Sequence, residues 1–73
     1  MINTKFNIME MWIARDDDGT LYLFKNKPVK GISTWHDEAN NDYNNYFEID
    51  RNSFPEIQWE DNEPTLVTIT INE

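Results

Sequence analysis

The chain has no cysteine, one histidine and only two glycines among its 73 residues. Without cysteine it can form neither a disulfide nor a thiolate metal site. None of its apolar runs approaches the length of a membrane-spanning helix, and residues 1–8 lack the basic start and apolar core of a signal peptide. We therefore expect a cytoplasmic protein that does not associate with membranes.

The residue types that catalysis needs are also scarce. Nucleophilic catalysis requires a nucleophile, a base and an orienting group within hydrogen-bond reach of one another. The single histidine, His36, and the two serines, Ser33 and Ser53, lie in no catalytic motif. The acidic run at residues 16–18 does not follow the ligand spacing of a calcium loop. We expect no enzymatic activity, no catalytic residue, no cofactor and no metal site.

Basic residues are few, with 6 Lys and Arg against 14 Asp and Glu and a formal net charge of −8. Residues 31–73 hold ten acids and one base, whereas residues 1–30 hold four acids and five bases. Such a surface repels nucleic acid, because binding phosphates needs clustered Lys and Arg. It attracts basic protein surfaces, although excess charge also serves simply to keep a small domain in solution. We expect a protein partner and no direct nucleic-acid binding.

Residues 10–25 predict a β-hairpin, because two runs of aromatic and aliphatic residues flank an Asp-Gly pair. We expect a three-residue loop at residues 17–19, with Gly19 in the left-handed conformation. This loop pairs Trp12 with Phe24, whereas loops of two or four residues would change the pairing.

Both faces of this hairpin are apolar, which is unusual for a small antiparallel sheet. A single-layer barrel would bury only one of these faces, so the other needs a second cover. One face is expected to carry Met11, Ile13, Leu21 and Leu23, and the other Trp12, Ala14, Tyr22 and Phe24.

Short β-rich runs separated by turn signals follow the hairpin. Residues 36–45 read as a long Asn-rich loop, and residues 1–8 as either a short edge strand or a frayed terminus. We expect a single all-β domain over residues 1–73, with five or six mostly antiparallel strands in a curled sheet or an SH3-like or OB-like barrel. The further strands are expected at residues 29–35 with a bulge or bend at Gly31, at 46–49, at 56–59 and at 65–72, the last with Val67, Ile69 and Ile71 on one face.

A resemblance rests on two strings, W-I-A-R-D-D-D-G-T-L-Y-L-F at residues 12–24 and F-P-E-I-Q-W-E-D-N-E-P at residues 54–64. Both are similar to a family of short uncharacterised proteins from gut Bacteroides-type bacteria, their prophages and their phages. The similarity covers around half of the chain, and the family has no assigned activity. The resemblance implies a small accessory protein of mobile-element origin.

Aromatic residues make up 14% of the chain and are the main positive signal for binding, because Trp and Tyr are common at interfaces. The same residues also serve as core in a domain that has little other bulk. The protein-binding residues are predicted to be Trp12, Tyr22, Phe24, Glu60, Asp61 and Glu63.

The function predicted from these features is that of a non-enzymatic acidic interaction protein. It would act as a phage or prophage accessory or inhibitor that binds a basic, nucleic-acid-binding host protein. The alternative is a structural protein that self-associates, as a homodimer, through its aromatic sheet face. A small ligand-binding domain or hydrolase is a third interpretation.

Overall fold

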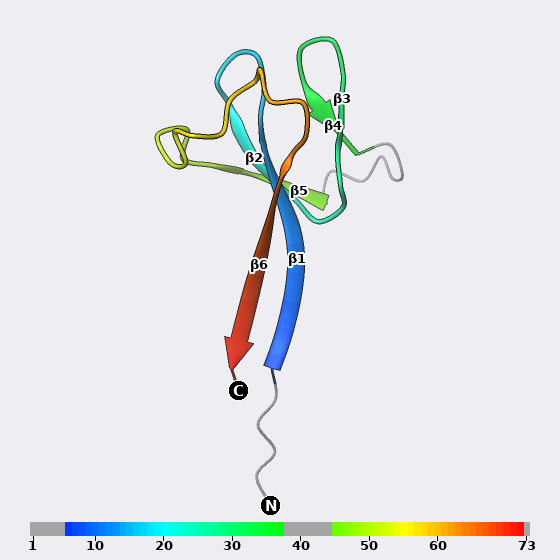
Figure 1. Ribbon diagram of the computed structural model, residues 1–73, viewed down its shortest axis with the longest axis vertical. Helices are drawn as coiled ribbons and strands as arrows, with labels where there is room; N and C mark the ends of the chain where they lie inside the picture. The colour runs from blue at the N-terminus through cyan, green and yellow to red at the C-terminus, as the bar shows by residue number, and fades with distance from the viewer. Residues whose placement is uncertain (1–5, 38–44, 73) are drawn as a thin grey trace, which may run out of the picture.

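The computed structural model describes residues 6–37 and 45–72, which form six β-strands. The strands are β1 (Phe6–Arg15), β2 (Leu21–Phe24), β3 (Val29–Lys30), β4 (Trp35–His36), β5 (Tyr46–Ile49) and β6 (Thr65–Asn72). Four of them make one antiparallel sheet in the order β5-β2-β1-β6, while β3 and β4 pair separately (Figure 1). The all-β prediction is confirmed. Of the expected architectures the curled open sheet forms, because β5 and β6 lie at opposite ends of the strand order.

The structure describes only parts of two predicted segments, the edge strand or frayed terminus at residues 1–8 and the Asn-rich loop at residues 36–45. Residues 6–8, from the expected edge strand or frayed terminus, belong to β1, and His36, from the expected Asn-rich loop, belongs to β4. The remaining parts of these predictions, at residues 1–5 and 38–44, lie outside the described residues.

The β1–β2 hairpin has the predicted loop and register. Trp12 pairs with Phe24, and the N–H of Asp16 donates to the carbonyl of Thr20 at 2.8 Å. Gly19 has a φ of +93°, a conformation that only glycine adopts at low cost. The predicted three-residue loop and its pairing are therefore confirmed, and the loops of two and four residues do not form.

Each face of the sheet packs under its own cover, as the two apolar faces of the hairpin require. On the first face, Ile13 and Leu21 bury against Ile57, which lies in the connection between β5 and β6. On the second face, Phe24 buries against Trp35 of β4. Half-buried side chains complete the clusters: Leu23, Ile49 and Val67 on the first face, and Trp12, Tyr22, Tyr46 and Trp59 on the second. The β5–β6 connection thus supplies a side chain to each face.

Arg15 holds this connection against the sheet. Its guanidinium donates hydrogen bonds to five backbone carbonyls at donor–acceptor distances of 2.6 to 3.2 Å. One acceptor is Gly19 in the hairpin loop, and the other four are Arg51, Ser53, Phe54 and Ile57 in the β5–β6 connection. A guanidinium carries five N–H donors in a rigid fork, so one side chain ties together two loops that are distant in sequence.

Phe54 lies inside this clamped segment in a strained conformation. Its φ of +53° is in the left-handed region, which is uncommon for a bulky residue and costs on the order of 1–3 kcal/mol. Its carbonyl accepts hydrogen bonds from Arg15 at 3.2 Å and from the N–H of Ile57 at 3.0 Å. These bonds hold the segment in the strained conformation.

The single strand predicted at residues 29–35 is wrong, because the segment folds back on itself as the β3–β4 hairpin. The N–H of Gly31 donates to the carbonyl of Thr34 at 2.7 Å and closes the turn. A Cβ atom on Gly31 would lie 3.0 Å from that carbonyl oxygen, so a side chain at this position would require the turn to shift.

The strand predicted at residues 56–59 is also wrong, because this segment forms turns. The N–H of Ile57 donates to the carbonyl three residues before it, and the carbonyl of Ile57 accepts from Arg15 at 2.6 Å. The N–H of Ile57 is therefore used in a turn and its carbonyl in the bond to Arg15. Neither group is left to pair with a neighbouring strand.

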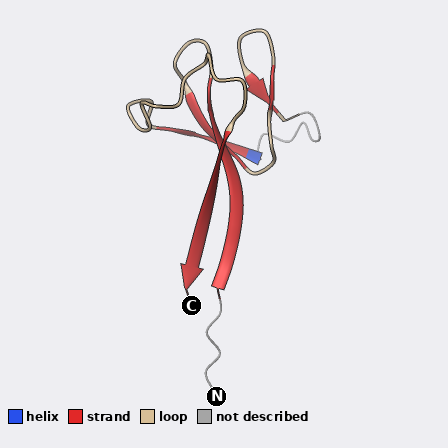
Figure 2. Ribbon diagram, in the orientation of Figure 1, coloured by secondary structure: helices blue, strands red, loops and turns tan. Residues whose placement is uncertain are grey.

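Beyond the region where β2 pairs with β1, residues 6–10 and 68–72 continue as a two-stranded ribbon, which projects from the rest of the molecule in Figure 1. We call residues 11–37 and 45–67 the head, in which loops make up much of the chain (Figure 2). The predicted alternation of β6 is present, since Val67 and Ile69 are half-buried whereas Thr68 and Thr70 are exposed. The side chain of Ile71 lies outside the described residues.

Replacing Gly19 should separate backbone strain from steric conflict. A Cβ atom there would meet Arg51 Nη1 at an ordinary 3.6 Å, so only the positive φ resists substitution. We expect Gly19→Val to lower the free energy of unfolding by more than about 1 kcal/mol, and Gly19→Asn to cost less, because Asn tolerates positive φ. Urea denaturation of the two variants measures the difference, and equal losses would contradict this account.

Replacing Arg15 should loosen the β5–β6 connection. We expect Arg15→Met to lower the free energy of unfolding by about 2–4 kcal/mol, because the charged donor of five hydrogen bonds is lost. Arg15→Lys keeps the charge but not the planar fork, so it should recover only part of this loss. Full recovery by lysine in urea denaturation would show that the charge matters and the fork does not.

Candidate functional site

The aromatic residues predicted to bind a partner share one sheet face but do not form an open surface. Phe24 is 2% exposed and is packed against Trp35, while Trp12 and Tyr22 are half-buried in the same cluster. Trp59 covers this cluster from the β5–β6 connection. The structure therefore brings the three predicted aromatics together as core.

Asp16 anchors the cover of this face. Its carboxylate oxygen Oδ1 accepts a hydrogen bond from the backbone N–H of Trp35 at 2.8 Å, and the indole N–H of Trp35 donates to the carbonyl of Arg15 at 3.1 Å. The N–H of Asp17 also donates to the carbonyl of Ser33 at 3.1 Å. The end of β1 and the β1–β2 loop therefore bind the β3–β4 hairpin through three hydrogen bonds.

The carboxyl group of Asp16 is itself buried, with 6% of the residue exposed. Burial raises the pKa of this carboxyl above its ordinary value of 3.8, and the charge of Asp18 acts in the same direction. The hydrogen bond from Trp35 opposes both effects without cancelling them. By contrast, the backbone N–H of Thr20 donates to the exposed carboxylate of Asp18 and lowers its pKa.

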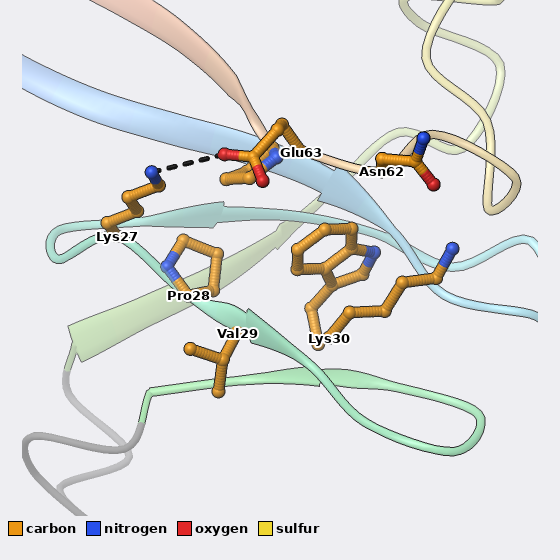
Figure 3. Close-up of a pocket in the computed structure, with 8 residues that line it drawn as sticks. Lys27, Pro28, Val29, Lys30, Asn62 and Glu63 are labelled. Atoms are coloured by element: carbon orange, nitrogen blue, oxygen red, sulfur yellow. Dashed lines mark ion pairs between the residues drawn. The ribbon is translucent and has the colours of Figure 1, made fainter.

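A groove of about 320 Å³ lies where the β3–β4 hairpin meets the β5–β6 connection (Figure 3). This volume is near the lower limit for small-molecule sites. Its lining combines apolar and charged side chains, namely Lys27, Pro28, Val29, Lys30, Trp35, Asn62, Glu63 and Pro64.

The two lysines at this groove are occupied by groups of the protein. Lys27 Nζ lies 3.2 Å from the carboxylate of Glu63, as the dashed line in Figure 3 shows. Lys30 donates to the carbonyls of Trp59 and Asp61, and its Nζ lies 4.2 Å from the centre of a Trp59 ring. The lysines hold the acidic turn over the hairpin, so the groove offers no free ammonium group to an anionic ligand.

Of the three acids predicted to bind a partner, Glu63 lines this groove whereas Glu60 and Asp61 do not, and the three differ in their availability. Glu63 pairs with Lys27, and Asp61 Oδ2 accepts a hydrogen bond from the N–H of Gln58 at 3.1 Å. Their positions in a turn predict exposed carboxylates without internal partners, and this prediction is wrong for Asp61 and Glu63. Glu60 is exposed and has no hydrogen bond or ion pair within the region that the structure describes.

Sequence reasoning missed the residues that position these groups. The sequence patterns place Arg15 and Asp16 in the hairpin and Lys30 in a strand, but they assign no contact to these side chains. Their acceptors and donors are mostly backbone groups of other segments, so no residue type marks them in the sequence.

Within residues 6–37 and 45–72, no three His, Asp or Glu side chains gather in an arrangement that would hold a metal ion. The same residues include no helix with the length and hydrophobicity needed to cross a bilayer. Comparison with protein-family models, with curated proteins and with solved structures found no match to this chain.

Substitutions at Asp16 should separate its hydrogen bond from its charge. Asp16→Ala leaves the buried N–H of Trp35 without an acceptor and should cost roughly 1–3 kcal/mol of unfolding free energy. Asp16→Asn retains an acceptor oxygen and removes the buried charge, so it should cost clearly less. Thermal or urea denaturation at neutral pH distinguishes the two variants.

The pH dependence provides the second measurement on Asp16. A raised pKa means that the folded protein retains this proton to higher pH than the unfolded chain. Relative to Asp16→Asn, the wild-type protein should therefore lose stability as pH rises from below 3.8 through the raised pKa. A difference between the two proteins that stays constant with pH would contradict the burial of an ionisable Asp16.

Proposed function

We propose that this protein is a non-enzymatic interaction protein whose acidic head binds a basic surface on a protein partner. The observation that carries the proposal is the difference between the cations and the carboxylates of the head in their contacts with the rest of the chain. Its cationic side chains turn toward groups of the protein itself, whereas several of its carboxylates face solvent and have no hydrogen bond or ion pair with the residues that the structure describes.

Every Lys and Arg of the head contacts a group of the same chain. Arg15 is bound by carbonyls, Lys27 by Glu63, and Lys30 by two carbonyls and an indole ring. Arg51 donates to the hydroxyl of Thr20, and Lys25 lies over the ring of Phe47 at 5.6 Å. These contacts reduce the ability of the cations to reach an external anion.

The carboxylates of the head outnumber these cations. The head holds ten Asp and Glu and five Lys and Arg, a formal balance of −5. Asp17, Glu56 and Glu60 are exposed, and their carboxylates have no hydrogen bond or ion pair among the described residues. A surface of this kind favours encounter with a basic partner and raises its association rate.

The chemistry of this surface indicates the class of partner. Exposed carboxylates carry charge of the same sign as phosphates, so a basic protein that normally binds nucleic acid is a suitable target. The resemblance of residues 12–24 and 54–64 to proteins of phages and prophages favours an accessory or inhibitory role. The buried position of Phe24 gives no support to an aromatic binding face.

The test is binding to a lysine peptide as a defined basic probe, followed by affinity capture from the native host with mass spectrometry. We expect association to slow as salt rises from about 50 to about 500 mM, because the Debye length falls from roughly 14 to roughly 4 Å. Neutralising Asp17, Glu56 and Glu60 together should slow association more than it speeds dissociation.

A matched pair of variants locates the effect on the head. Glu60→Gln and Glu10→Gln make the same chemical change, one on the head and one on the ribbon. We expect a larger fall in association rate for Glu60→Gln. Equal effects of the two variants, or binding that is unchanged at high salt, would contradict the proposed acidic site.

A further inference from the structure

The outer edge of β6 has no neighbouring strand among the described residues, because β6 is the last strand in the order β5-β2-β1-β6. Thr65–Asn72 contains no charged residue, no proline and no glycine. Proteins usually protect an exposed edge with such residues, with a bulge or by making the strand short. None of these devices is present along this eight-residue strand.

The charge distribution makes this edge suitable for a second copy of the chain. Two chains that each carry a net charge of −8 repel each other wherever acidic surfaces meet. Of the residues that form the ribbon, 6–10 and 68–72, only Glu10 is charged, and it lies on β1. The opposite edge of the sheet, β5, has only four residues and includes the exposed Glu48.

We propose that the protein forms a homodimer in which the β6 strands of two copies pair edge to edge and antiparallel. This inference is independent of the proposed function, because it concerns the uncharged edge of β6 and not the acidic loops of the head. A two-fold axis near Thr68 and Ile69 preserves the two faces of the sheet, so Val67 and Ile69 meet the same apolar face of the partner. Thr68 and Thr70 meet on the other face, as neutral cross-strand neighbours.

The antiparallel orientation also separates the heads. Thr65 lies at the head end of β6 and Asn72 at the tip of the ribbon, so pairing places each head beside the tip of the other chain (Figure 1). At about 3.3 Å per residue, the Thr65 ends of the two paired strands, to which the acidic turns connect, lie roughly 25 Å apart, well beyond the Debye length of about 8 Å in physiological salt. Repulsion between two acidic heads therefore opposes this dimer only weakly.

Pairing would stabilise the ribbon and would also limit the assembly to two copies. A two-stranded ribbon is marginally stable in water, and in the dimer it becomes part of a four-stranded one. Each copy uses its β6 edge in the same two-fold contact, so the assembly closes as a dimer and does not grow into a fibre.

Sedimentation velocity between about 1 and about 100 μM tests the proposal, with the whole chain as the sample. We expect the wild-type protein to dimerise in this range and Thr68→Lys to weaken the dimer by roughly tenfold or more, because it places like charges near the axis. This change reduces the magnitude of the net charge, so greater overall repulsion cannot explain a loss of dimer.

The matched control is Ile8→Lys, which adds the same charge on the exposed ribbon but on β1, where Ile8 pairs with Thr70. It should leave the dimer intact. Hydrogen exchange of the wild-type protein gives an independent measurement, because outward-facing amides of β6 should gain protection as concentration rises. A wild-type monomer at 100 μM, or a dimer that Thr68→Lys does not weaken, would overturn the proposal.

Discussion

The guanidinium of Arg15 donates to five backbone carbonyls, four of which lie 36 to 42 residues away in the chain. The β5–β6 connection that it holds has turns but no strand of its own, and it includes the strained residue Phe54. The same connection carries Ile57 to one face of the sheet and Trp59 to the other. The hydrogen bonds of Arg15 therefore hold a segment that contributes to the packing of both faces.

A chain of 73 residues has few segments with which to cover a sheet that has two apolar faces. Neither face has a helix or a second full sheet to pack against among the described residues, so short segments serve as covers. Hydrogen bonds hold these segments in place, with Arg15 on one side and Asp16 on the other. Polar contacts thus stabilise loops that a larger domain would stabilise by burying more apolar surface.

The charged side chains and the uncharged edge of β6 lie in different parts of the molecule. The head carries nearly all of the described Asp, Glu, Lys and Arg side chains, and the ribbon carries one. Acidic loops on the head suit encounter with a basic partner, and the neutral edge of β6 suits pairing with an equally neutral strand. A dimer built on that edge would present two acidic heads at opposite ends, so the two proposed interactions do not compete for the same surface.

The sequence by itself determined the elements whose signals are local. Asp18-Gly19 set the hairpin loop, and the alternation of Thr65–Asn72 set β6 with its bounds. Composition could not decide whether Trp12, Tyr22 and Phe24 are core or interface, because the same alternation suits both and only the cover distinguishes them. The tertiary structure alone decided that cover, through contacts of Arg15, Asp16 and Lys30 with distant backbone groups. Every residue except proline has a backbone N–H and every residue has a carbonyl, so nothing in the sequence distinguishes the few that these side chains bind.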